Sequence, residues 1–336
     1  MHRIISICIG LLLSICVKSQ DFHLSQYDAS PLYLNPSLTG LFDGEYRVHT
    51  HYRNQWSSIT SPFTTTSIGF DMPVKKIGIG GIILNDRAGS GNYNVLNFLS
   101  SFSYDHSIGK LNDHHIGIGI QLGFIHKSLL INDIYFPNQY EYTSTNGFNS
   151  NLPSGENIAN TSFFLPEIAI SILYYYSKNE SSAHPFVGCS VFHLTEPTET
   201  FYSNNNQLPR RVVVHTGVKF NIGNSIQITP KLMTMTQGNA NESNVGLLAS
   251  YFIRQENTWV FIGTNYRIFK MNNLESNDAM VVQFGVKHKN LTYRISYDNN
   301  ISSLSSVSNG NGAFELSVTY IKNKKTLQKP TICPKL

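Results

Sequence analysis

Apolar and polar side chains alternate along short stretches of this chain from about residue 45 to residue 321, and turn residues separate the stretches. The alternation is clearest over 291–298 and 314–320, where Leu, Ile, Val, Tyr and Phe take every second position. A period of two is the repeat of a β-strand, whose successive side chains point to opposite faces. No helical period interrupts the pattern, so the sequence predicts an all-β protein.

The alternating stretches predict about fourteen strands, most of them near the roughly 9–11 residues that a tilted strand needs to cross a bilayer. An even number of strands is typical of single-chain outer-membrane barrels. The predicted strands are Glu45–Trp56, Phe63–Asp71, Lys76–Asp86, Tyr93–His106, His114–Leu129, Phe163–Tyr176, Phe186–Leu194, Arg211–Phe220, Ile226–Thr236, Asn244–Arg254, Trp259–Phe269, Asp278–Lys287, Leu291–Asp298 and Ala313–Ile321.

The connections between the predicted strands differ in length according to their parity. If the first strand runs outward, the outer set contains the longest connections, 130–162, 195–210 and 299–312, together with 237–243 and 270–277. Bacterial barrels have long surface loops, short periplasmic turns and both termini in the periplasm. A soluble sandwich, the alternative, gives no reason for such sorting. The sequence therefore predicts a transmembrane antiparallel β-barrel of about fourteen strands in the outer membrane, with both termini periplasmic.

The composition favours the membrane barrel over the sandwich. Charged residues make up 14% of the chain, against a norm of about 25%, and the chain contains 18 Tyr, 20 Phe and 24 Gly. A lipid-facing apolar surface with aromatic girdles at its rims accounts for this balance. The formal charge of +4 is small and dispersed, so we expect no nucleic-acid partner.

The two ends of the chain indicate export. A basic start, His2 and Arg3, precedes an apolar run over 4–17, so residues 1–19 are interpreted as a signal peptide, and the run is too short for a membrane-spanning helix. The tail 322–336 follows the last predicted strand and is rich in Lys and Pro, and we expect it to extend into the periplasm.

The cysteines indicate neither a lipid anchor nor a disulfide framework. A lipid anchor at Cys16 is disfavoured, because Ile15 stands where lipoprotein signals carry a small residue. Outside the signal peptide only Cys189 and Cys333 remain, which allows one bridge and no disulfide framework.

Residues 20–44 precede the first predicted strand and form a separate unit. They contain Asn35-Pro36 and two glycines, which favour a compact irregular segment over a strand. At the mouth of a barrel such a segment can fold into the lumen as a plug, and the barrel itself is predicted over 45–321. Glycines on predicted strands then make room for a large neighbour or for the plug, at Gly78, Gly80, Gly81, Gly117, Gly119 and Gly123.

The first predicted strand carries a polar stripe on one face, at Glu45, Arg47, His49, His51 and Arg53. Charges on one face of a barrel strand must meet water or pair with each other in the lumen. The stripe is therefore either a contact or selectivity surface or a network that joins the wall to the plug, and the network is the preferred interpretation. His49 and His51 have the spacing of a metal-binding pair, but no third ligand is identifiable, so we expect no metal or cofactor.

The sequence offers no catalytic motif. It lacks Gly-x-Ser-x-Gly and His-Glu-x-x-His, and no nucleophile stands beside a convincing base. We therefore expect a protein that is not an enzyme, while dispersed Ser, His and Asp residues at a barrel rim leave a hydrolase as an open hypothesis.

A series of short segments runs in order along the expected mature chain. They are Ser25-Gln26-Tyr27, Leu34-Asn35-Pro36-Ser37-Leu38-Thr39-Gly40, Tyr52-Arg53-Asn54-Gln55-Trp56, Asn85-Asp86-Arg87-Ala88-Gly89, Ser296-Tyr297-Asp298 before Ser303-Leu304, Gly312-Ala313-Phe314-Glu315-Leu316 and Cys333-Pro334. The ordered set resembles the PorP/SprF family of the Bacteroidetes type IX secretion system over essentially the whole mature chain. Two positions depart from the family pattern: Ser37 replaces an expected Ala, and Lys335-Leu336 replaces a basic and aromatic pair.

The resemblance implies an outer-membrane barrel that works with the type IX translocon and with periplasmic ring and peptidoglycan-linked components. Similar proteins are needed for secretion or surface attachment of particular cargo, often large adhesins with a C-terminal sorting domain, including those used in gliding. We expect the family-motif residues to lock the first strand to the plug rather than to contact cargo. These residues are Asn35, Pro36, Gly40, Arg53, Asn54, Gln55 and Trp56.

Two other classes of function stay open from the sequence. A passive or substrate-selective porin is the main alternative, since the Arg and His stripe faces the expected lumen. A hydrolase at the rim is the third hypothesis.

Overall fold

The structure is a computed structural model that describes most of the chain. The expected signal peptide, residues 1–19, lies outside the described residues, as do Cys333 and the tail from residue 325 onward. Cys189 has a free thiol. The described residues are 20–57, 61–89, 92–131, 134–142, 147–149, 151–156, 158, 160–178, 180–202, 206–272, 274–303 and 305–324.

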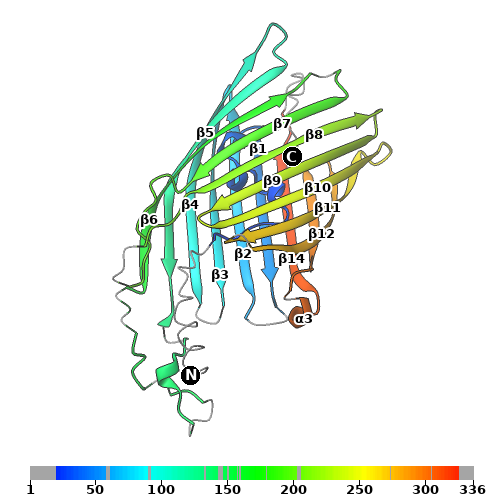
Figure 1. Cartoon of the computed structure of the whole chain (residues 1–336). Coiled ribbons are helices and arrows are strands. Elements are labelled where there is room, and N and C mark those ends of the chain that lie inside the picture. Colours follow the sequence, from blue (N-terminus) through cyan, green and yellow to red (C-terminus); the bar gives the residue numbers. More distant parts are fainter. Residues whose placement is uncertain are drawn as a thin grey trace.

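Fourteen antiparallel strands close into a barrel in which each strand pairs with its neighbours in sequence (Figure 1). Closure occurs where the first strand pairs with the last, with Tyr46 opposite Lys322 and Gln55 opposite Ala313. The predicted fold class, a transmembrane β-barrel of about fourteen strands, is confirmed. No helix among the described residues is long and apolar enough to cross a bilayer.

The strands have the following bounds: β1 (Tyr46–Gln55), β2 (Phe63–Val74), β3 (Ile77–Ala88), β4 (Tyr93–Ile108), β5 (His114–Ser128), β6 (Ser162–Tyr176), β7 (Ala183–Phe192), β8 (Arg211–Ile222), β9 (Ile226–Gln237), β10 (Ala240–Ile253), β11 (Thr258–Met271), β12 (Leu274–His288), β13 (Leu291–Asn300) and β14 (Asn311–Lys322). The helical turns are η1 (Tyr27–Ala29), α2 (Pro31–Leu34), η2 (Pro36–Leu38), η4 (Pro137–Gln139) and α3 (Ser305–Ser308).

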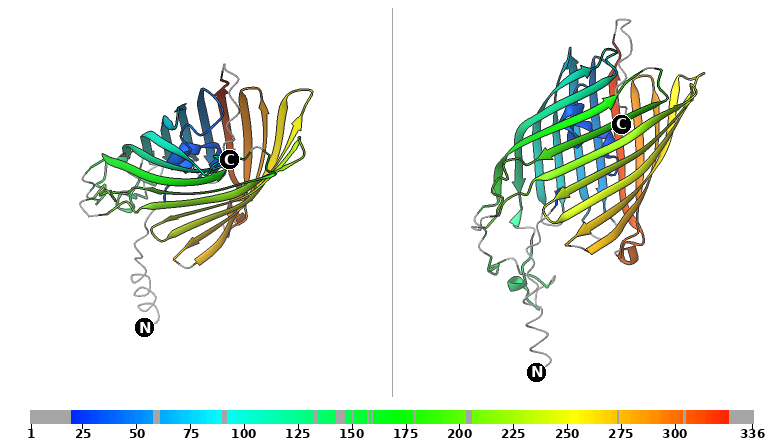
Figure 2. Two further views of the ribbon diagram at one scale, coloured as in Figure 1. Left: turned by 90° about the horizontal axis from the view of Figure 1, so that it is seen from above. Right: turned by 45° about the horizontal axis from the view of Figure 1, so that its top comes forward.

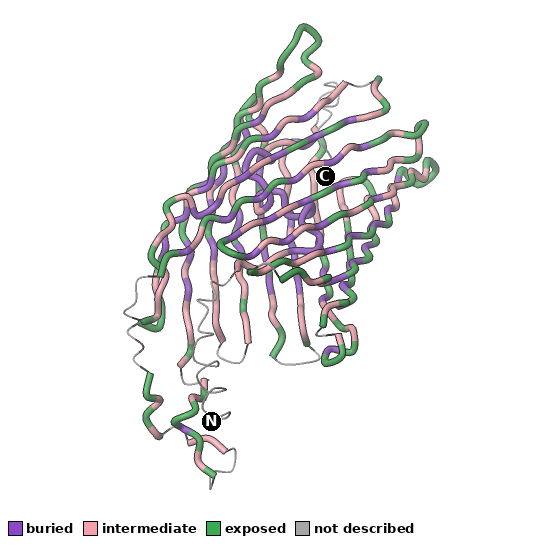
Figure 3. Tube along the Cα trace, viewed as in Figure 1, coloured by how far each residue is buried: buried purple, intermediate pink, exposed green. Residues whose placement is uncertain are grey.

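The alternation of side chains along each strand separates an apolar outer face from a polar inner face. On β13, Tyr293 and Ile295 are exposed on the outside, whereas Arg294 and Asp298 are buried inside. The same alternation of buried and exposed positions runs along most strands (Figure 3). A closed barrel with an apolar exterior pairs its backbone internally and suits a lipid environment.

The connections lie at two ends of the barrel. The longest ones, 129–161, 193–210 and 301–310, share one end, here called the loop end, and the opposite end is here called the turn end. The turn end has short connections such as 75–76 and 289–290. The sorting of connections by parity thus holds in the structure.

The bounds predicted for two surface connections are wrong. Most of residues 237–243 and 270–277 belong to the strands of two hairpins, because β10 begins at Ala240 and β12 at Leu274. At the start of β10 both faces are polar, with Glu242 buried and Asn241 half-buried. The ladder therefore continues where the hydrophobic alternation has already stopped.

Residues 20–44 lie inside the barrel and are here called the lumen segment (Figure 2). The segment starts at the loop end, where the Asp21 carboxylate contacts His193 just after β7. It leaves at the turn end, where the Glu45 N–H donates a hydrogen bond to the Lys322 carbonyl. The described chain therefore begins and ends at opposite ends of the barrel, and the expectation that both ends share one side does not hold for it. The lengths of the connections depend on the direction of the strands, so they do not predict the course of a segment that crosses the lumen.

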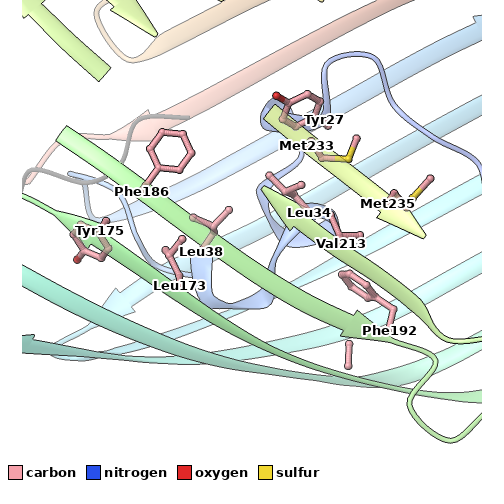
Figure 4. Close-up of a cluster of buried hydrophobic side chains, with 11 residues drawn as sticks. Tyr27, Leu34, Leu38, Leu173, Tyr175, Phe186, Phe192, Val213, Met233 and Met235 are labelled. Atoms are coloured by element: carbon pink, nitrogen blue, oxygen red, sulfur yellow. The ribbon is translucent and has the colours of Figure 1, made fainter. Parts of the chain in front are cut away.

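Apolar side chains dock the lumen segment on one side of the wall (Figure 4). Tyr27, Leu34 and Leu38 contact inward-facing residues of β6 to β9, so this part of the lumen surface is apolar where the segment covers it. The wall residues of this cluster are Ala169, Leu173, Tyr175, Phe186, Phe192, Val213, Met233 and Met235.

Two strand glycines allow the backbone of the lumen segment to approach the wall. A Cβ added at Gly78 would overlap the carbonyl oxygen of Thr39, and one at Gly119 would stand 2.5 Å from the carbonyl carbon of Pro36. The predicted role of these two glycines, to make room for an inner segment, is confirmed. Gly117, two residues earlier on the same face, leaves ordinary space, because its nearest neighbours would be 3.6 Å away in Ser37.

The pair allows a matched test. We expect Gly119→Ala to lower the free energy of unfolding by about 1–3 kcal/mol, since the added methyl group overpacks against the segment backbone. Gly117→Ala should change it by less than about 0.5 kcal/mol. Denaturant unfolding of both variants in the same detergent measures the difference, and equal stabilities would show that the segment does not press against β5.

Candidate functional site: the interface between the lumen segment and the barrel wall

The polar stripe of β1 lies at this interface. His51 and Arg53 are buried, and His51 Nε2 lies 3.1 Å from Glu315 of β14. His49 is fully buried, and neither of its ring nitrogens has a hydrogen-bond partner among the described residues. Nowhere in the described part of the chain do three or more His, Cys, Asp or Glu side chains form a group able to hold a metal ion.

The other motif residues of the first strand make contacts within the barrel wall. The Gln55 side-chain oxygen accepts a hydrogen bond from Arg53 at 3.1 Å. The Asn54 amide donates to the Tyr52 hydroxyl on the exposed side, and the Trp56 ring packs against Phe63 at 5.1 Å. Asn54 and Trp56 therefore make these contacts with the barrel itself and not with the lumen segment.

Ser25 is the centre of a buried charge cluster. Its hydroxyl accepts hydrogen bonds from Arg53 at 2.9 Å and from Arg267 at 2.8 Å, and it donates to Asp298 at 2.6 Å. Asp298 lies 3.3 Å from Arg53 and 3.1 Å from Arg267, and Arg53 also pairs with Glu315. Two guanidinium groups thus face two carboxylates, which balances charges that are all at least 97% removed from solvent.

The backbone at Ser25-Gln26 is held by the same cluster. Both carboxylate oxygens of Glu315 accept backbone N–H groups, from Ser25 at 2.7 Å and from Gln26 at 2.8 Å. The Gln26 amide donates to Ser296 at 2.9 Å, and its oxygen accepts from Ser317 at 2.7 Å. Strands β13 and β14 therefore bind this turn of the lumen segment through both its backbone and its side chains.

Asp28 joins the segment to two further strands. Its carboxylate lies 2.7 Å from Lys231 of β9 and 2.6 Å from Arg294 of β13. The carboxylate therefore bridges strands that do not pair with each other.

The loop end has its own charged group. The Asp21 carboxylate lies 2.7 Å from His193 Nε2 and 3.3 Å from Arg211, while Glu167 lies 2.6 Å from His193 Nδ1. Burial alone would lower the pKa of His193, but the two carboxylates raise it to about 9. The imidazole is thus a cation at neutral pH, and the pKa of Asp21 is lowered despite its burial.

The Asn35-Pro36 motif shapes the middle of the segment. The Asn35 side-chain oxygen accepts the backbone N–H of Ser37 at 2.8 Å, which caps η2, and Pro36 takes the first position of that helix. The Asn35 amide reaches the Ile172 carbonyl at 3.3 Å and His215 Nε2 at 3.1 Å. The Asn35 side chain therefore starts η2 and ties the segment to β6 and β8, while its backbone N–H donates to the Pro31 carbonyl at the end of α2.

Gly40 and Arg47 close the turn end of the interface. Gly40 has a φ of +69°, a conformation suited to glycine, and its N–H donates to the Asp71 carboxylate at 2.7 Å. Arg47 binds both oxygens of the same carboxylate at 2.9 and 2.7 Å and donates to the Leu38 carbonyl at 3.1 Å. This bidentate pair holds the exit of the segment against β1 and β2.

A small cavity of about 80 Å³ remains at the loop end of the interface. Its lining combines apolar and charged side chains from the lumen segment and the wall, including Tyr33, Asp86, Lys127 and Arg211. Lys127 is paired with Glu199 at 2.6 Å, so the connection 193–210 also folds over this region.

Sequence reasoning identified one side of the interface and missed most of its partners. Asp71, Lys231 and Arg267 were not singled out, although each is a charged residue on an inward position of a predicted strand. An isolated charge at such a position is a usable signal, because a charge in a lumen needs water or a partner.

Removal of one guanidinium tests the central cluster. We expect Arg53→Gln to lower the free energy of unfolding by about 3–5 kcal/mol, because Glu315 and Asp298 lose a buried counter-ion. Denaturant unfolding in detergent measures this effect. Arg87→Gln is the control: Arg87 is exposed, and within the described residues its side chain bonds that of Asn92, so we expect a change within about 0.5 kcal/mol. Equal effects would show that the cluster does not stabilise the fold.

The charged group at the loop end predicts a pH dependence. The pKa of His193 is about 9 in the folded chain and 6.5 as the reference value, so its stabilisation is complete below pH 6.5 and is lost as pH rises through about 9. We expect wild-type stability to fall by up to about 3 kcal/mol over this range. His193→Gln should remove this fall. Unfolding curves at a series of pH values measure it, and identical profiles would exclude a charged His193.

Solved structures with the same fold include two channels of low sequence identity. CymD, a monoaromatic hydrocarbon channel, superposes with a TM-score of 0.51 at 9% identity, covering 89% of this chain and 94% of CymD. The Pseudomonas putida toluene transporter TodX gives a TM-score of 0.50 at 10% identity, covering 91% and 95%. At these identities the likeness shows the fold alone.

Sequence comparisons give the family. No curated protein sequence matches the chain. The model of the family described as type IX secretion system membrane protein PorP/SprF matches residues 16–320, which include the lumen segment and all but the end of β14. The chain therefore belongs to the PorP/SprF family of type IX secretion system membrane proteins.

Proposed function

We propose that this protein is a non-catalytic outer-membrane component of the type IX secretion system that supports secretion or cell-surface anchoring of specific cargo. The expected cargo is a large protein with a C-terminal sorting domain, such as an adhesin, including one used in gliding. The observation that carries the proposal is the lumen segment, which is bound to the wall through Asp21, Ser25 and Asp28 and leaves the two ends of the barrel as surfaces for partners.

The lumen segment supports a scaffold rather than an open channel. Its removal would unpair Lys231 and Arg294 from Asp28, and a buried charge that loses its partner is strongly destabilising. It would also take from Asp298 and Glu315 the hydrogen bonds that Ser25 and Gln26 donate. The segment thus acts as a fixed plug of the family barrel. The proposal assigns the protein no catalytic residue and no cofactor.

The orientation follows from the lengths of the connections. We place the loop end at the cell surface and the turn end in the periplasm, as in other bacterial barrels. The long connections then offer a docking face for cargo, and the turn end faces the periplasmic ring and peptidoglycan-linked components. In this orientation β14 delivers the C-terminal tail to the periplasm, whereas Asp21 lies on the surface side.

The porin is the main alternative. The Arg and His stripe that suggested a porin is bound instead. Arg47 and Arg53 donate hydrogen bonds to Leu38 and Ser25 of the lumen segment, and His51 contacts Glu315 of β14. This arrangement favours a structural role for the stripe. Planar-bilayer conductance separates the two functions, because a plugged barrel should stay closed.

Loss of the gene tests the proposed function. We expect a deletion strain to lose surface display of at least one cargo with a type IX sorting domain, because the barrel presents its docking face. Surface labelling followed by mass spectrometry measures this loss. Affinity isolation of the tagged protein in mild detergent should also recover that cargo or translocon and ring components.

Complementation provides the controls. The wild-type gene and Arg87→Gln, an exposed position, should both restore display of the cargo. Normal display of every type IX cargo in the deletion strain, together with stepwise conductance of the pure protein, would contradict the scaffold and support the porin.

A further inference from the structure

The barrel wall has one short seam. Strands β6 and β7 pair over only six residue pairs, from Ile170 opposite Val191 to Tyr175 opposite Phe186, whereas every other neighbouring pair of strands has nine or more. Strand β6 continues beyond β7 toward the loop end, and β6 and β7 are both labelled in Figure 1. Among the described residues, 162–168 of β6 thus have β5 on one side and no strand on the other, and this side is here called the free edge of β6.

The chain turns inward where β7 ends. The Leu194 N–H donates to the Ile168 carbonyl at 3.0 Å, and the His193 N–H donates to the side chain of Glu167 at 2.9 Å. These two bonds close the base of the seam. Between Ile168 and Ser162, the connection 193–210 contacts the inner face of β6, where Leu208 packs with Leu165. It returns to this edge at the other end, where the Asn160 N–H donates to the Phe201 carbonyl at 3.3 Å, so the unpaired stretch is a short window between these bonds.

The backbone groups of the free edge have a defined direction. In an antiparallel ladder, alternate residues bond opposite neighbours, and the bond from Leu129 N–H to the Thr161 carbonyl assigns the odd residues to β5. The even residues, Ser162 and Phe164, therefore point their N–H and C=O groups toward the free edge. In the part of the chain that is described, no backbone group pairs with them there.

Pro166 is the next even residue of β6. Proline has no backbone N–H, so this residue leaves no unpaired donor at the free edge. The free edge thus offers two N–H donors and three carbonyl acceptors, from Ser162, Phe164 and Pro166.

The free edge lies beside the apolar outer surface. Phe164 is 68% exposed, and its ring lies 5.6 Å from Phe124, which stacks at 5.6 Å on Phe98. This aromatic row runs across β4, β5 and β6 and ends at the free edge. Unpaired backbone groups are costly beside lipid, and a lipid chain has no donors or acceptors for them.

The chemistry of the free edge selects its occupant. A strand added beside β6 would satisfy the five backbone groups, as in β-strand addition at other sheet edges. Its inward side chains would meet the apolar layer of Leu165, Leu208 and Phe163, and its outward side chains would continue the row that ends at Phe164. The occupant is therefore an extended polypeptide with apolar residues on both faces.

We propose that the free edge of β6 binds an extended segment of the secreted cargo by β-strand addition at the loop end. The identity of the partner rests on the proposed function, which places the docking face for cargo at that end. The strand addition itself rests on the short seam, the unpaired edge and the apolar surroundings.

A proline at position 164 tests the edge. Phe164→Pro removes the N–H that points to the free edge and leaves the ladder with β5 intact, as Pro166 already does. We expect this variant to retain about tenfold less cargo than the wild type in affinity isolation. Phe164→Leu keeps the N–H and should retain cargo within about twofold. Both variants should unfold at the same denaturant concentration.

A photo-crosslinker gives a readout that does not depend on the proline. p-Benzoylphenylalanine at position 164, irradiated in intact cells, should crosslink to a C-terminal segment of a secreted protein, as identified by mass spectrometry. The control is the same group at Phe284, which is outward and 49% exposed on the fully paired β12. It should crosslink to no secreted protein.

The outcomes separate the two proposals. Strand addition alone would be overturned if the wild type and Phe164→Pro retained cargo equally. It would also be overturned if position 164 crosslinked only to lipid or to the chain's own connections, 129–161 and 193–210. Failure of the wild type to retain any type IX cargo would overturn the proposed function and, with it, the cargo as the partner of the free edge.

Discussion

The need to pair every backbone N–H and C=O group inside the protein governs this structure. In hydrocarbon an unpaired group has no water to bond, so the strands close into a barrel through β1 and β14. Because of the same constraint, a strand edge that lacks a pairing strand is informative. Strand β7 ends at Phe192, so residues 162–168 of β6 extend beyond it beside an apolar outer surface.

The lumen brings a second constraint, because charges removed from water need partners. Arg53 and Arg267 face Asp298 and Glu315 around Ser25, while Asp28 lies between Lys231 and Arg294. Such pairs gain little net stability over apolar packing, but the loss of one member is costly. They therefore specify where the lumen segment sits, and the apolar cluster around Leu34 and Leu38 contributes hydrophobic burial.

The two constraints together direct the function to the ends and the outer wall. The lumen is occupied by a segment fixed at Asp21, Ser25, Asp28 and Gly40. In the proposed function such a barrel acts as a rigid support, with long loops at one end and short turns at the other. This division agrees with membership of the PorP/SprF family.

The fold class could be predicted from the sequence, because the alternation along each strand is a local signal and the lengths of the connections can be read along the chain. The sequence also indicated the stripe from Arg47 to Arg53 and the motif at Asn35-Pro36. Only the tertiary structure decided their partners: Glu315 and Asp298 stand more than two hundred residues from Arg53, and the direction of the lumen segment places Asp21 at the loop end. The physical reason is that barrel closure and lumen filling juxtapose distant positions whose pairing leaves no periodic trace along the chain.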